Sequence, residues 1–249
     1  MISNREIIQR NIFYDVCFFI ISSCLCVNVL GEELIELKPH EANYDVSIKG
    51  FTGELKTSLR NTDAFKYHAE DKIKTTGLAG IFLKGTVIST AEFFIQNDKL
   101  KPHHFYSKDT ISKEKKELTL NFDWTLNQVS IKENELDSAM PINDSIKDRI
   151  TLKYALMTDL INNRLSSQYS LYEGDKIKKI ETTNLGFKII TLDHGEYRVV
   201  GIQNQALGSS KLSILWCAEE LGFLPVLIEQ YRNDKLWMSA SLISYKEIT

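Results

Sequence analysis

Histidines and carboxylates are the side chains most able to hold a metal ion or transfer a proton, and here their spacing predicts neither chemistry. The chain has five histidines, and no HExxH sequence occurs. His103 and His104 are adjacent, and because neighbouring side chains on a strand point to opposite faces, their rings would point apart. We therefore expect no metal site, and we assign His194 to a polar turn.

The glycines and serines give no stronger signal for catalysis. Gly80 and Gly85 are spaced as in a phosphate-binding loop, but Thr86 stands where such a loop needs a lysine. A bend between strands explains these glycines better. No GxSxG sequence would expose a nucleophilic serine. The acidic residues between 117 and 137 are scattered with Lys115, Lys116 and Lys132, as on a solvated strand face. We therefore expect no enzyme and no cofactor, with a hydrolase as the least favoured function.

The first 31 residues have the layout of a signal peptide. Arg5 and Arg10 precede an apolar run over residues 16–30, and Gly31 is a small residue before an acidic start. A run of about 15 apolar residues is short for a bilayer span, which needs about 20. We expect residues 1–31 to be removed on export, with cleavage near Gly31. An uncleaved anchor or a core helix is the alternative.

Lipidation at Cys24 is a second interpretation of this segment. Residues 21–24, Ile-Ser-Ser-Cys, resemble the lipobox of bacterial lipoproteins, in which the cysteine becomes the acylated first residue. The apolar run continues to Leu30, whereas an acylated cysteine is usually followed by a polar tether. Lipidation is therefore less favoured than cleavage near Gly31.

The cysteines agree with an exported chain that needs no disulfide. Cys17, Cys24 and Cys26 lie in the export segment, which leaves Cys217 alone in the mature chain. A domain of this size can bury enough apolar surface without cross-links. The apolar neighbours of Cys217 predict a buried, unreactive thiol.

The composition is that of a folded globular protein. Of 249 residues, 43% are hydrophobic and 25% are charged, which excludes a collagenous, low-complexity or disordered chain. The 30 basic and 33 acidic residues give a net charge of -3. We expect no nucleic-acid partner, because a phosphate-binding surface needs clustered basic residues.

From Tyr44 onward the dominant period is two. Leu118, Leu120 and Phe122 alternate with polar residues, as expected of a half-buried strand. Short polar connectors such as residues 233–234 carry the residues that tight turns favour. We predict many short strands joined by hairpins in an antiparallel barrel or strongly curved sheet. Further strands are predicted over residues 55–59, 65–73, 86–95, 129–132, 169–172, 177–183, 187–192, 197–202, 212–217, 226–231 and 236–245.

One segment breaks this period and predicts a central amphipathic helix of about 18 residues. Ser145 and Asp148 have the spacing of a capping box, in which two side chains cover the free amides of the first turn. The helix would close one mouth of the sheet or plug its concave face. No linker or repeat divides residues 32–249, which we expect to be a single β-barrel-like domain. The apolar stripe consists of Ile146, Ile150, Tyr154, Met157 and Ile161.

Several strands are apolar on both faces, most clearly in residues 236–245. Such a strand must be covered twice or must line a cavity. One interpretation is that the helix covers one face, and the other is an apolar pocket for a lipid or another hydrophobic ligand. The residues proposed for this pocket are Trp237, Ile243, Tyr245, Trp124 and Phe122.

Three stretches carry a resemblance to a family of bacterial exported proteins known as domain-of-unknown-function family 3108. The resemblance spans about residues 40–246 of this chain. The resemblance implies an envelope location and an antiparallel β fold, and it implies no reaction and no functional residues. The stretches are residues 44–53 with 66–68, 75–79 and 99–102; residues 121–124 with 140–141 and the predicted helix start at Asp144; and residues 215–226 running on to 242–245.

These observations lead to a hypothesis of a periplasmic, non-enzymatic protein that holds a hydrophobic ligand or assists envelope assembly. The alternative is a structural or protein-interaction module without a ligand cavity. The expected partners are a lipid or hydrophobic small molecule, or an envelope protein. Removal of residues 1–31 would leave a chain without a long apolar run, so the mature protein is expected to be soluble.

Overall fold

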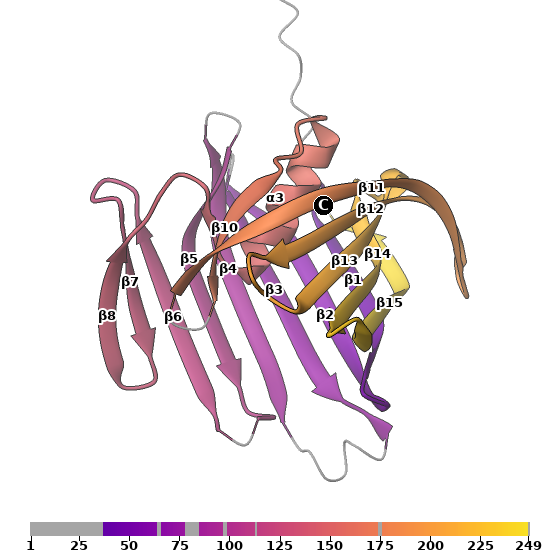
Figure 1. The fold of residues 1–249 in the computed structure, drawn as a ribbon, viewed down its shortest axis with the longest axis horizontal. Helices are drawn as coiled ribbons and strands as arrows, with labels where there is room; N and C mark the ends of the chain where they lie inside the picture. The colour runs from indigo at the N-terminus through magenta and orange to yellow at the C-terminus, as the bar shows by residue number, and fades with distance from the viewer. Residues whose placement is uncertain are drawn as a thin grey trace, which may run out of the picture. The chain divides into compact units, whose positions relative to one another are not determined.

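The computed structural model describes residues 37–63, 66–77, 85–96, 99–112, 114–173 and 176–248, within the compact unit formed by Ile35–Thr249 (Figure 1). The predicted signal peptide of residues 1–31, its cleavage site at Gly31 and the alternative lipidation site at Cys24 lie outside the described residues. In the described ranges, no helix is both long and apolar enough to cross a membrane.

The described chain forms one sheet of 15 strands, in the order β8-β7-β6-β5-β4-β3-β2-β1-β15-β14-β13-β12-β11-β10-β9. The predicted mainly β architecture with one helix is confirmed, although the sheet is not closed into a barrel. The strands are β1 (His40–Ile48), β2 (Phe51–Asp63), β3 (Lys66–Thr75), β4 (Thr86–Gln96), β5 (Lys99–Asp109), β6 (Lys116–Asp123), β7 (Gln128–Glu133), β8 (Leu136–Pro141), β9 (Ile146–Lys147), β10 (Gln168–Glu173), β11 (Lys176–Leu192), β12 (Gly195–Ala206), β13 (Lys211–Ala218), β14 (Leu224–Arg232) and β15 (Lys235–Glu247).

Neighbouring strands pair antiparallel throughout, except that β9 and β10 are parallel. The sheet curls so that its β9 edge lies against β5, and β11 and β12 arch across the other strands (Figure 1). The hairpins follow from their turn residues. Asn233 and Asp234, with φ of 49° and 59°, both adopt the left-handed conformation that asparagine and aspartate tolerate.

The helix α3 (Arg149–Ile161) has 13 residues, so the predicted length of about 18 was wrong. Its N-cap is Asp148, whose side chain accepts hydrogen bonds from the backbone N of Ile150 (2.8 Å) and Thr151 (2.9 Å). Thr151 completes the capping box, because its Oγ1 accepts a bond from the backbone N of Asp148 at 2.9 Å. Ser145 plays no capping role and instead bonds the Oγ of Ser170 at 2.9 Å.

The helix starts late because the residues before it are held in the sheet. Ile146 and Lys147 pair with Ser170 and Leu171 of β10, which keeps their backbone extended. Ile146 is therefore buried as a strand residue and not as the first turn of the helix. The predicted helix start at Asp144 was wrong for the same reason.

Three residues of the predicted apolar stripe lie at the centre of the core, and Ile161 is half-buried against it. Ile150, Tyr154 and Met157 are buried, and the helix packs against β3, β4, β5, β9 and β10. The Tyr154 ring stacks on Phe93 of β4 at 5.5 Å, and Phe93 stacks on Tyr67 of β3 at 5.4 Å. This face of the helix is closed, so any ligand site must use another face.

Candidate functional site

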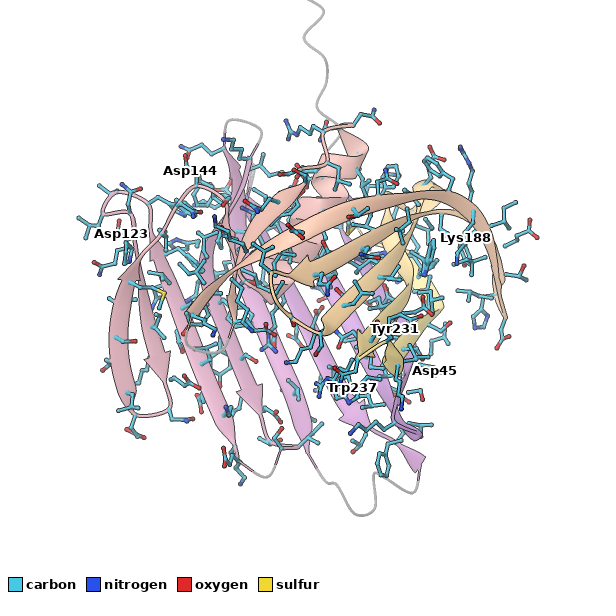
Figure 2. All side chains as sticks on the ribbon, in the orientation of Figure 1. Asp45, Asp123, Asp144, Lys188, Tyr231 and Trp237 are labelled. Atoms are coloured by element: carbon cyan, nitrogen blue, oxygen red, sulfur yellow. The ribbon has the colours of Figure 1, made fainter. Side chains whose placement is uncertain are left out.

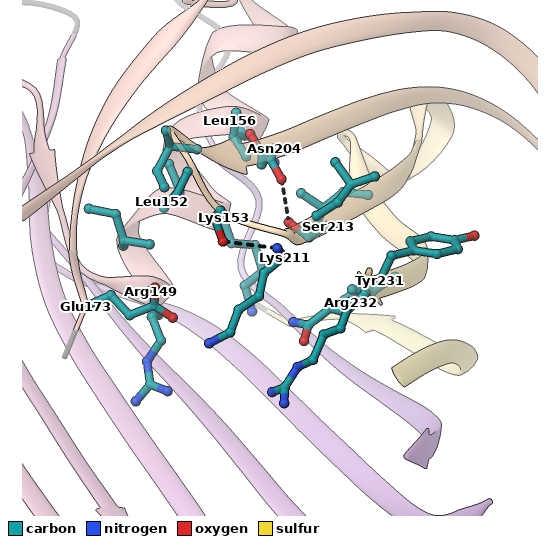
Figure 3. Close-up of a pocket in the computed structure, with 18 residues that line it drawn as sticks. Arg149, Leu152, Lys153, Leu156, Glu173, Asn204, Lys211, Ser213, Tyr231 and Arg232 are labelled. Carbon is teal, nitrogen blue, oxygen red and sulfur yellow. Dashed lines mark hydrogen bonds between the residues drawn. The ribbon is translucent and has the colours of Figure 1, made fainter. Parts of the chain in front are cut away.

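A second face of α3 lines a cleft. Arg149, Leu152, Lys153 and Leu156 recur at the spacing of one helical stripe, and all four border the same cavity of about 310 Å³. The opposite wall comes from β10 to β14 (Figure 3). This volume is at the small end of the range found for ligand pockets, roughly 300 to 1,000 Å³.

Part of the interior of the cleft is aliphatic. Leu156, Leu171 and Ile180 are buried within it, whereas Leu152, Leu215 and Ile228 keep part of their surface exposed. Leu215 and Ile228 are directly opposite each other on β13 and β14. The cleft thus exposes aliphatic surface that neither the helix nor the sheet covers, and burying such surface stabilises a complex by about 25 cal/mol per Å². The remaining aliphatic side chains that line the cleft are Ala206 and Leu212.

The polar groups deep in the cleft already have partners. The buried side chain of Asn204 accepts a hydrogen bond from Thr182 Oγ1 at 2.8 Å. Ser213 donates its hydroxyl to the carbonyl of Asn204 at 3.4 Å. The part of a ligand that lies here would contact polar groups whose hydrogen bonds are already made within the protein. It therefore needs no hydrogen-bonding groups of its own.

Charged side chains lie toward the mouth of the cleft. Lys153 is ion-paired with Asp71 of β3 at 2.9 Å, and Glu173 is ion-paired with Lys178 at 2.7 Å. Burial would raise the pKa of Glu173, but the hydrogen bond and charge of Lys178, together with the charges of Lys211 and Arg149, outweigh it and lower the pKa. Glu173 is therefore an ionised, neutralised group. The other charged residues of the lining are Arg149, Lys211 and Arg232.

The five residues predicted for an apolar pocket are not gathered in one place. Phe122 and Trp124 stack on each other at 6.4 Å, and Trp124 Nε1 donates to the carbonyl of Pro102 at 2.8 Å. They belong to β6 and the turn after it, and five strands separate β6 from β15. None of the five lines the cleft, although Arg232 of its rim lies over the Trp237 ring at 3.6 Å.

Two irregularities in β15 explain why the predicted alternation fails there. The pairing with β1 shifts between Asn43 and Tyr44, opposite Ile243. Tyr245 therefore pairs with the buried Ala42 and lies 5.8 Å from the His40 ring. A second shift, opposite Trp237, breaks the pairing with β14. Each irregularity reverses which side chains share a face.

The cleft itself was not predicted. Its signal in the sequence is the spacing of Leu152 and Leu156, four residues apart and preceded by Arg149 and Lys153 on the same stripe. The opposite wall could not be found in this way, because its strands lie between residues 168 and 232 and are brought to the helix only by the curl of the sheet.

Two further predictions concern single residues. Cys217 is free and buried, and burial raises the pKa of its thiol. Its predicted burial is therefore confirmed, and its lack of reactivity stays a prediction. Among the described residues, no group of three or more side chains is arranged to hold a metal ion.

The chain belongs to the family described as "Protein of unknown function (DUF3108)", which matches residues 43–234. The predicted membership is therefore confirmed. No curated protein matches the chain.

Among the solved structures, the chain is similar to a beta-barrel-like protein of domain of unknown function DUF1849 from Brucella abortus, with a TM-score of 0.59 and 10% identity over 86% of this chain and 99% of that chain. At this identity the likeness supports the fold alone. The chain is thus a DUF3108 member whose described residues form an open, curled sheet around the helix α3.

Proposed function

We propose that this protein is a non-enzymatic binding protein of the periplasm, which holds a hydrophobic ligand in the cleft between α3 and β10 to β14. The observation that carries the proposal is the aliphatic lining of that cleft. Leu152, Leu215 and Ile228 stay partly exposed, while the other face of the same helix is sealed against the sheet.

Binding is a better account of this cleft than catalysis. Its deep polar groups, Asn204 and Ser213, are hydrogen-bonded to neighbours, and its carboxylate Glu173 is neutralised by Lys178. A general acid or base needs a group free to exchange a proton with a substrate. The periplasmic location rests on the signal-peptide layout of residues 1–31.

A neutral fluorescent probe tests the binding site. N-phenyl-1-naphthylamine brightens when it enters an apolar pocket, and we expect the full chain to bind it saturably. Leu215→Gln should weaken this binding about tenfold, because it places an amide in the apolar wall. Ile214→Gln is the matched control, since Ile214 is the next residue of β13 and is absent from the lining of the cleft. Equal effects of the two substitutions would contradict the proposal.

Native mass spectrometry after gentle purification separates this function from the alternative of an interaction module. A co-purifying lipid or other apolar molecule supports a binding protein, and a clean apo mass together with no uptake of the probe contradicts it. Osmotic-shock fractionation tests the location. We expect release with the periplasmic fraction and a mature chain that starts near Glu32, whereas membrane retention that is abolished by Cys24→Ser would contradict a soluble periplasmic protein.

The interaction module has one observation in its favour. Beyond the irregularity at Asn184, β11 carries Phe187 and Ile189, which are 54% and 63% exposed. Among the described residues, this end of β11 pairs only with β12. An exposed strand edge with apolar side chains is a common site for partner binding. Substitution of both residues by serine should leave probe binding unchanged and would reduce only the binding of a partner protein.

A further inference from the structure

The mouth of the cleft carries an excess of positive charge, because among the described residues Arg149, Lys153, Lys211 and Arg232 line it together with a single carboxylate, Glu173. Arg149, Lys211 and Arg232 extend toward the same side of the cleft (Figure 3). None of the three makes an ion pair with a residue that the structure describes. Among the described residues, Arg149 donates to the hydroxyl of Ser107 at 3.3 Å, and its charge helps to lower the pKa of both Asp109 and Glu173. Arg232 lies over the Trp237 ring.

Strand register brings these cations together. Lys211 is directly opposite Arg232 in the pairing of β13 with β14, and Arg232 is directly opposite Lys235 in the pairing of β14 with β15. Like charges at directly opposite positions of an antiparallel pair destabilise the sheet. Asp234, in the turn between these strands, makes no ion pair with a described residue. A row of three cations therefore crosses one end of the sheet without an ion pair to any described residue, although the charge of Lys211 acts on Glu173 of the cleft.

We propose that the ligand of the cleft is an anionic amphiphile, with a carboxylate or phosphate head group among Arg149, Lys211 and Arg232 and an acyl chain against Leu152, Leu215 and Ile228. This inference rests on the proposed function and adds the chemistry of the ligand.

The geometry selects the charge of the head group. Guanidinium groups present paired donors that match the oxygens of carboxylate and phosphate, and the lysine ammonium adds a third charge. A cationic head group would meet like charges at this mouth. An uncharged head group would leave the opposed Lys211 and Arg232 without compensation, so it would gain only the burial of its chain.

Displacement of N-phenyl-1-naphthylamine from the full chain tests the inference with four dodecyl compounds that differ only in their head group. Dodecanoate and dodecyl phosphate should displace the probe at concentrations about tenfold lower than dodecanol, and dodecyltrimethylammonium should be the weakest. Added salt should weaken the two anions and leave dodecanol unchanged. The stronger of the two anions shows whether a fatty acid or a phospholipid-like head group is preferred.

Charge reversal locates the effect. The double variant Lys211→Glu, Arg232→Glu should lose about tenfold or more in dodecanoate binding and keep its affinity for dodecanol. The double variant Lys211→Arg, Arg232→Lys keeps both charges and should retain dodecanoate binding. That result would show that the loss in the reversed variant comes from charge and not from a local structural change. Lys179→Glu is the matched control, because Lys179 lies on β11 beside the lining residue Ile180 but is itself absent from the lining.

The two possible failures are distinguishable. Equal displacement by dodecanol and dodecanoate, or an unchanged dodecanoate affinity in the double reversal, would overturn the anionic head group and leave an apolar binding cleft. If the wild-type chain binds neither the neutral probe nor any of the four compounds, the proposed function itself is overturned.

Discussion

Trp216 of β13 lies flat against Gly201 of β12, its directly opposite partner in the sheet. A Cβ atom at position 201 would be 2.5 Å from Cζ3 of the indole ring. The ring is held in place from its other sides, because its Nε1 donates to Glu229 at 2.8 Å and Lys188 Nζ lies 3.2 Å from its centroid. The Trp216 stretch that marks the family therefore has a structural role in this chain.

Gly201→Ala should destabilise the protein by about 1 to 3 kcal/mol, because the added methyl group forces the indole ring to move. Chemical denaturation monitored by circular dichroism measures this. Combination with Trp216→Leu should recover part of the loss, since the smaller side chain makes room for the methyl group. Strictly additive effects of the two substitutions would contradict the close contact.

Asp148→Ala should cost about 1 to 2 kcal/mol of folding free energy, because it removes the acceptor for two free amides of the first helical turn. Ser145→Ala, which alters the residue that the sequence pattern alone assigns to the cap, should change stability by less than about 0.5 kcal/mol. Urea denaturation compares the two variants. A larger loss for Ser145→Ala than for Asp148→Ala would contradict the observed helix start.

Lys147 gives the protein a pH-dependent stability. It is 5% exposed, and burial lowers its pKa from 10.5 to about 8, although Asp159 and Asp148 oppose this shift. Between these values the unfolded chain binds more protons than the folded one, so stability should rise as the pH rises from about 8 to 10.5. Below this window the full cost of the buried charge is present.

Lys147→Met should remove this cost. We expect the variant to be more stable than the wild type at neutral pH by up to about 3 kcal/mol, and the difference should shrink toward high pH. Thermal unfolding across the pH range measures it. Lys99→Met is the control, because Lys99 and Lys147 line a second cavity, separate from the cleft, and Lys99 is exposed. If the stability difference between Lys147→Met and the wild type does not depend on pH, Lys147 is not a destabilising buried charge.

The strands and hairpins were predictable because their side chains obey local rules. Two runs predicted as separate strands, residues 177–183 and 187–192, are one strand, β11. The pairing shifts after Asn184, and Gly186 takes a φ of 82° there, so the break in the pattern marks an irregularity within a strand. The strand β5 was not among the predicted runs, because Pro102 and two adjacent histidines hide its alternation.

The cleft was beyond sequence reasoning for a physical reason. Trp237, Ile243 and Tyr245 share one face of β15 in a regular alternation, but pairing irregularities set by β1 and β14 decide which of them face inward. Leu152 of α3 and Leu215 of β13 belong to one cleft because the sheet curls over the helix, and no local pattern records that curl. The opposition of Lys211 and Arg232 likewise follows only from strand register.

Photo-crosslinking with a dodecanoic acid analogue that carries a diazirine near its methyl end tests the central claim most directly, because it records where the ligand lies. The account predicts saturable labelling that dodecanoate competes away, with adducts in the peptides that contain Leu152, Leu215 and Ile228. Adducts at Phe122 and Trp124, adducts confined to residues 237–245, or labelling spread evenly over the exposed surface would contradict a binding site between α3 and β10 to β14.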